Sequence, residues 1–93
     1  MNAARGEAAL LVAGRTARVC LTLGALAEIE AALGCPTFEA LRARLKDLSA
    51  GDLGLVLKAL LRGGGEDPAL AGEAAPGAAA RAIAEAFERG LGD

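Results

Sequence analysis

Apolar and polar residues alternate along the start of the chain with the period of a β-strand. Two short apolar runs, at residues 8–13 and 17–21, flank a turn at residues 14–15. Every second residue of the later run is apolar, as expected for a sheet with one solvated face. These residues therefore predict a β-hairpin. A lone hairpin is only marginally stable in water, so helices should cover its apolar face.

Beyond the hairpin the apolar residues recur every three or four positions, which predicts three helices. A Thr or Ser precedes each segment and can cap it, and Ser49 with Asp52 matches a capping box. The predicted helices are residues 23–33 after Thr22, residues 38–48 after Thr37, and a third after Ser49 that ends at Arg62. Their apolar stripes are Leu26, Ile29 and Leu33, then Phe38, Leu41, Leu45 and Leu48, and finally Leu53, Val56, Leu57, Leu60 and Leu61.

Three consecutive glycines at residues 63–65 follow the third helix. Anions bind at helix N-termini, whereas these glycines follow a C-terminus and no Lys-Ser or Lys-Thr pair comes after them. They therefore predict a helix stop and not a phosphate-binding loop. Residues 66–77 are rich in Gly, Ala, Pro and acidic residues, which is typical of a flexible linker.

A last amphipathic helix is predicted at residues 78–93, with Ile83 and Phe87 on a narrow apolar face. Because that face is narrow, we expect weak docking; a permanently packed fourth helix is the alternative. The fold class is therefore α+β, an N-terminal β-hairpin packed against a small bundle of three to four α-helices. Residues 1–65 form the predicted domain, 66–77 the linker and 78–93 the tethered helix. A chain of 93 residues has room for one small domain.

Composition narrows the range of functions. The chain is 54% hydrophobic with a formal net charge of -2, so it can form a core. No apolar run is long enough to span a bilayer, and no signal-peptide core follows the first residues, so we expect a cytoplasmic protein with no membrane partner. Cys20 and Cys35 are expected to be reduced core residues.

The residue inventory does not favour catalysis. The chain has no His, Tyr or Trp, and its carboxylates lack the spacing of a metal site, so we expect no enzyme activity, no metal and no cofactor. Residues 38–62 superficially resemble a helix-turn-helix. The second helix would begin with Asp52 and apolar residues in a net negative chain, so we expect no nucleic-acid partner.

Three segments, "RGEAAL", "LTLGALAEIEAALG" and "LLRGGG", resemble in their order and distances the small tail assembly chaperone family of gene transfer agents and related phages. That family is also catalogued as a tail tube protein. The resemblance covers roughly residues 2–65. It implies a non-catalytic tail assembly chaperone or adaptor that binds the tail tape-measure protein, the tail tube protein or both. The alternative is a structural tail component, which we expect to need a more extended sheet than one hairpin. Self-association is left open.

Four residues are candidate partner contacts: Leu55, Arg62, Ile83 and Phe87. Leu55 points away from the apolar stripe of the third helix, where it is either an ordinary exposed leucine or a contact with another protein. Ile83 and Phe87 dominate the apolar face of the last helix, which fits a module that binds helices.

Overall fold

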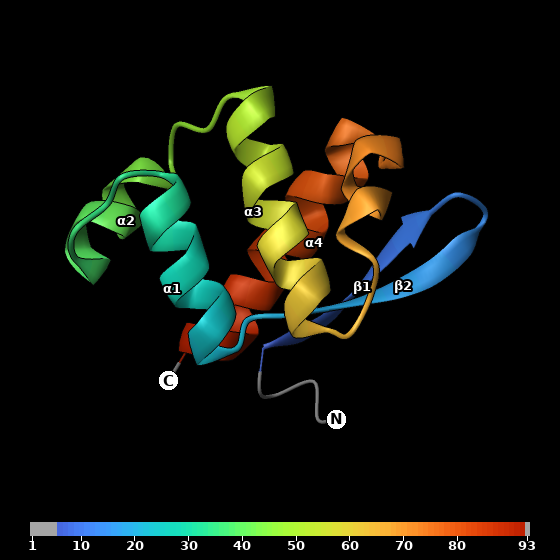
Figure 1. The fold of residues 1–93 in the computed structure, drawn as a ribbon, viewed down its shortest axis with the longest axis horizontal. Helices are drawn as coiled ribbons and strands as arrows, with labels where there is room; N and C mark the ends of the chain where they lie inside the picture. Colours follow the sequence, from blue (N-terminus) through green and yellow to red (C-terminus); the bar gives the residue numbers. More distant parts are fainter. Residues whose placement is uncertain (1–5, 93) are drawn as a thin grey trace.

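The computed structural model describes residues 6–92 and has the predicted α+β architecture, a hairpin followed by helices (Figure 1). The elements in chain order are β1 (Glu7–Val12), β2 (Arg15–Cys20), α1 (Leu23–Ala32), α2 (Phe38–Arg44), α3 (Ala50–Gly63), the 3-10 helix η2 (Pro68–Glu73) and α4 (Pro76–Leu91). None of these helices combines the length and the apolar composition that a bilayer crossing requires.

The predicted hairpin is confirmed. β1 and β2 pair antiparallel, with Leu10 opposite Ala17. The turn lies at Ala13-Gly14, one residue earlier than predicted, and both residues have positive φ, 53° and 73°. This is the geometry of a two-residue turn whose twist matches the strands, and Gly14 adopts it without steric cost.

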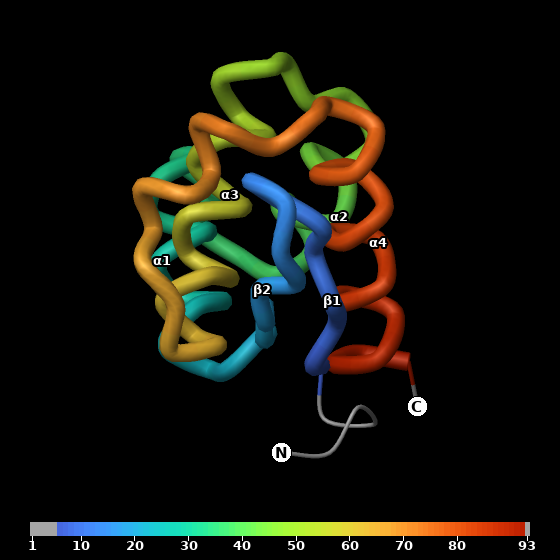
Figure 2. The backbone as a smooth tube through the Cα atoms, turned by 90° about the vertical axis from the view of Figure 1, so that its right-hand side faces the viewer, coloured from blue at the N-terminus to red at the C-terminus, as the bar shows by residue number. Residues whose placement is uncertain are grey.

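One face of the hairpin forms part of the core. Its buried side chains are Ala8, Leu10, Val12, Ala17 and Val19. Figures 1 and 2 show the hairpin lying across α3 and α4, with β1 beside α4 and β2 beside α3. The helices thus cover the apolar face, as the marginal stability of a lone hairpin requires.

The predicted N-caps are confirmed, but α2 is shorter than predicted. The hydroxyls of Thr22, Thr37 and Ser49 each accept a hydrogen bond from the main chain three residues later. α2 ends at Arg44 because the next turns tighten, with main-chain bonds from Lys46 to Ala43 and from Asp47 to Arg44. Such bonds between residues three apart are typical of a helix end.

The glycines at residues 63–65 end α3 and also allow it to touch β2. Gly65 has a φ of +79° and completes a Schellman motif, in which Glu66 N–H bonds the Leu61 carbonyl. A Cβ on Gly63 would overlap the Cys20 carbonyl oxygen, and a Cβ on Gly64 would overlap that of Arg18. The predicted helix stop is therefore confirmed, and the close approach to β2 is a second reason for glycine here.

Residues 66–77 contain regular structure where the sequence suggested a linker without any. The Asp67 side chain caps η2 and Pro68 occupies its first turn, a favourable start for a helix. Leu70, Ala71 and Ala74 pack against the core cluster. The flexibility of this segment in solution stays a prediction.

α4 begins at Pro76 and packs against the hairpin and α3. Its buried residues are Ala79, Ala82, Ile83, Ala86 and Phe87. Three of these five are alanines, so the helix approaches β1 closely. In the structure α4 and residues 6–65 contribute to one hydrophobic cluster.

Gly64→Ala should destabilise the fold by about 2 kcal/mol, because the added methyl would force α3 and β2 apart. Gly72→Ala is the matched control, since a Cβ there has no atom within 4 Å. It should change stability by less than about 0.5 kcal/mol. Urea denaturation monitored by circular dichroism measures both, and equal midpoints for the two variants would contradict the close-contact role of Gly64.

Candidate partner-binding surface

An apolar groove runs between the end of α2, the start of α3 and the outer side of α4. We call it the α2–α4 groove. Its volume is about 330 Å³, and its lining consists of Leu45, Leu48, Leu53, Ala80, Ile83, Ala84 and Phe87. All seven are apolar, so the groove suits apolar side chains.

The groove exists because α2 stops early and the chain then turns away. Leu45 and Leu48 lie beyond the helix end and are only half-buried. Arg44 holds this turn in place: its Nη2 lies 2.7 Å from Asp52 Oδ2, and its Nη1 donates to the Asp47 carbonyl at 2.9 Å. The same Asp52 carboxylate accepts the Ser49 N–H, and this bond, followed by the one from Arg44, lowers its pKa.

A second hollow of about 330 Å³ continues the groove toward the C-terminal end of α4. It shares Leu45 and Phe87 with the first, and its other lining residues are Arg42, Lys46, Glu88, Leu91 and Gly92. Leu91 is 39% exposed. The combined groove follows α4 from Ala80 to Leu91, which at 1.5 Å per residue is roughly 17 Å. That is the length of a helix of about three turns.

The four candidate partner contacts predicted from the sequence lie on two separate parts of the surface. Ile83 and Phe87 form the wall of the groove, although each is mostly buried. Leu55 lies on α3 about 200° around the helix from the groove residue Leu53, at 100° per residue. The structure therefore brings Ile83 and Phe87 together in the groove. It places Leu55 and Arg62 on a side of α3 that faces away from the groove.

Leu55 and Arg62 share that other side of α3, seven positions apart. Leu55 is 42% exposed. Arg62 forms an ion pair with Glu28, which joins α3 to α1. A role for either residue in partner binding stays a prediction.

Leu45, Leu48 and Leu53 are groove residues that the sequence analysis assigned to core stripes. For Leu45 and Leu48 the helical spacing is real, but a stripe predicts burial only as far as the helix continues. Leu53 lies inside α3, near its start, where it is partly buried. The signal that was available is the cluster of polar residues around them, with Lys46, Asp47 and Ser49 between and after the leucines. Such a run favours a turn over a helix.

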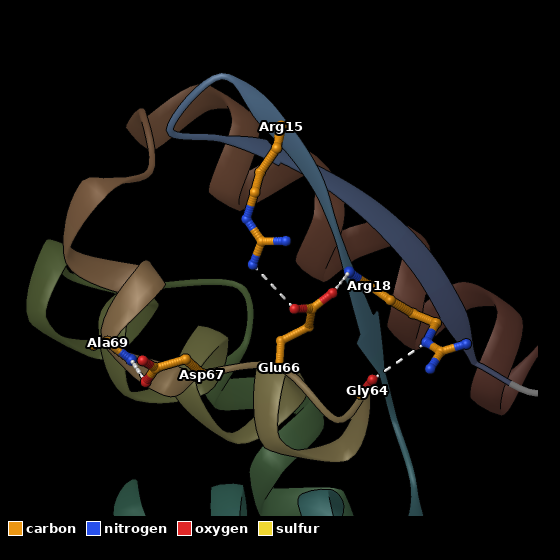
Figure 3. Close-up of polar contacts among 6 residues, drawn as sticks. All are labelled: Arg15, Arg18, Gly64, Glu66, Asp67 and Ala69. Carbon is orange, nitrogen blue, oxygen red and sulfur yellow. Dashed lines mark hydrogen bonds and ion pairs between the residues drawn. The ribbon is translucent and has the colours of Figure 1, made fainter.

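A polar cluster lies at the C-terminal end of α3, where the chain meets β2 (Figure 3). Glu66 accepts the main-chain N–H of Arg18 at 2.8 Å and the Arg15 guanidinium at 3.2 Å. Arg18 Nε donates to the Gly64 carbonyl at 3.2 Å. The bond from the Arg18 N–H, followed by the Arg15 contact, holds the pKa of the Glu66 carboxyl below its ordinary value. This cluster joins β2 to the end of α3.

The remaining chemistry-bearing groups do not form a site within residues 6–92. No group of three or more Cys, Asp or Glu side chains in this range could hold a metal ion. Cys20 and Cys35 are both buried. Burial, followed by the charge of Glu7, raises the pKa of the Cys20 thiol, which disfavours the reactive thiolate.

Comparison with protein families found a match to the family described as phage tail tube protein, GTA-gp10, over residues 5–92. The chain belongs to this family. Comparison with curated proteins and with solved structures gave no match. The resemblance to gene transfer agent tail proteins is thus confirmed, under the family's tail tube description.

The family match covers more of the chain than the resemblance seen in the sequence. The resemblance ended near residue 65, whereas the matched region includes η2 and α4. This agrees with the packing, because α4 supplies one wall of the groove and part of the core. The region of this chain that matches the family therefore includes α4.

Glu66→Gln should lower stability at neutral pH and reduce the loss of stability on acidification. A lowered folded pKa contributes stability that is present above the ordinary value of 4.5 and is lost as pH falls through the folded value. The difference between wild type and variant should therefore shrink below pH 4.5. Glu73→Gln, at an exposed carboxylate of η2, is the control. Urea midpoints measured across this pH range decide the matter; a constant difference would contradict the prediction.

Proposed function

We propose that this protein is a structural component of the tail of a phage-like particle, associated with the tail tube. The observation that carries the proposal is the family match over nearly the whole chain. A tail component acts through contacts with neighbouring subunits and not through a reaction. The described surface fits this role, because it carries an apolar groove and the exposed Leu11 side chain of the hairpin.

The small sheet is compatible with a structural role. A tube subunit is expected from sequence to need a more extended sheet than one hairpin. A two-stranded sheet can be extended by strands from neighbouring subunits, because its edges carry main-chain hydrogen-bonding groups. The limited strand content of the chain is therefore no argument against a place in the tail.

The second candidate function is a tail assembly chaperone or adaptor, and the α2–α4 groove favours it. Grooves of this kind bind amphipathic helices through apolar side chains spaced three and four apart. The combined groove is roughly 17 Å long, as estimated from the rise per residue along α4. Arg42 and Lys46 lie at one end of it. Under this candidate, a helix of the tape-measure protein, with acidic residues beside its apolar face, is the occupant.

Mass spectrometry of purified particles separates the two functions. A structural component should remain in the finished tail at a fixed ratio to the tail tube protein. A chaperone should be present in cell lysate and absent from the particle. Detection only in lysate would overturn the structural proposal and favour the chaperone.

Ala84→Glu tests the groove as a binding surface. Ala84 is exposed on α4, so the variant should fold, but a carboxylate in an apolar interface would have to be buried without a partner. Association with co-expressed tail proteins should weaken at least about tenfold, which corresponds to about 1.4 kcal/mol.

Ala27→Glu makes the same change at an exposed position of α1 that does not line the groove, and should leave association unchanged. Binding is measured by pull-down followed by titration calorimetry. Equal affinities for the Ala84→Glu and Ala27→Glu variants would exclude the groove as the contact surface.

A further inference from the structure

A third apolar hollow adjoins the α2–α4 groove at the start of α4. Its volume is about 200 Å³, and Leu53 lines both it and the groove. We call it the η2 hollow, because Ala71 of η2 forms part of its wall beside residues from the starts of α3 and α4. Its whole lining is apolar. A hollow of this kind accepts a single large aliphatic or aromatic side chain.

Apolar hollows therefore follow α4 along its whole length. The η2 hollow lies at Pro76 and Ala79, the α2–α4 groove at residues 80–87, and the hollow near Leu91, here the C-terminal hollow, at residues 87–92. Neighbouring hollows are about six residues apart on α4, which is roughly 9 Å at 1.5 Å per residue. Side chains seven residues apart on a helix share one face and lie about 10 Å apart. One bound helix can therefore fill neighbouring hollows.

Charged side chains line only one end of this surface. Arg42, Lys46 and Glu88 line the C-terminal hollow, whereas the other two hollows have apolar linings. Arg42 and Lys46 are exposed, and neither forms an ion pair within residues 6–92. This end is net positive, although the chain has a formal net charge of -2. It therefore complements an acidic group on a partner.

We propose that this surface binds an amphipathic helix that runs antiparallel to α4 and carries acidic side chains in its first turn. The inference rests on the proposed role of the groove as a contact surface for another tail component. Large apolar side chains seven residues apart fill the α2–α4 groove and the η2 hollow. The acidic first turn then lies in the C-terminal hollow, on the side of Arg42 and Lys46 and away from Glu88.

Two electrostatic effects favour this direction of the bound helix. Acidic side chains stabilise a helix at its N-terminus and destabilise it at its C-terminus. The acidic turn beside Arg42 and Lys46 is therefore the first turn. The C-terminal end of α4 borders the same hollow through Leu91 and Gly92, so its negative dipole end lies next to the positive end of an antiparallel helix.

Two model peptides with capped termini test the direction. Each has about four turns, leucines at spacings of three and four on one face, and two glutamates. The glutamates occupy the first turn of one peptide and, with the leucines at mirrored positions, the last turn of the other. Fluorescence anisotropy with purified protein should show at least about fivefold tighter binding of the first peptide. Equal dissociation constants, or no binding of either peptide up to about 1 mM, would overturn the proposal.

Lys46→Glu tests the charge contact from the side of the protein, because it replaces attraction of the first peptide by repulsion. The dissociation constant should rise about fivefold, which corresponds to about 1 kcal/mol. Lys58→Glu is the matched control at an exposed lysine of α3 that lines none of the three hollows, and it should leave binding within about twofold of the wild type. Circular dichroism confirms that both variants fold. Equal affinities of the two variants would overturn the assignment of an acidic partner.

The peptide results are independent of the analysis of particles. A chain that occurs in particles and binds neither peptide would keep the proposed place in the tail and lose the proposed helix. A chain that is absent from particles and prefers the first peptide would keep the helix and lose the structural place in the tail.

Discussion

The direct contact between the end of α3 and strand β2 is the constraint on which the rest of the structure depends. Gly63 and Gly64 lie so close to β2 that no side chain fits between them and the strand carbonyls. The side chain of Glu66, the last residue of the Schellman motif, then accepts the Arg18 N–H. A single short segment thereby ends a helix, positions it against the sheet and closes one sheet edge.

The apolar core is shared by all parts of the described chain, but its side chains are small. Alanine makes up much of the buried face of α4 and contributes to both strands. Small side chains bury little area each, and they allow close approach of main chains. The larger contributions come from the fully buried Leu10, Ile29, Leu41, Leu57, Leu60 and Leu61. A fold of this kind depends on fitted contacts more than on total buried area, which is why single methyl groups at the glycine contacts matter.

The apolar groove arises from a place where a helix stops. The α2–α4 groove opens where α2 ends at Arg44 and leaves Leu45 and Leu48 half-buried. An apolar groove of this kind suits a member of a tail protein family, because it offers a surface on which another tail component can pack.

The local elements of this protein were determined by the sequence itself. Alternation specified the hairpin, and Thr22, Thr37 and the Ser49–Asp52 box specified three helix starts, because period and capping act over a few neighbouring residues. Only the tertiary structure decided the rest. Whether Leu45 and Leu48 lie in the core or line the groove depends on the position of α4. Whether Gly64 only ends α3 or also contacts a strand depends on β2, where Arg18 is 46 residues away in the sequence. Residues 66–77 look irregular in isolation because their order comes from packing on α3, a contact that no local pattern contains.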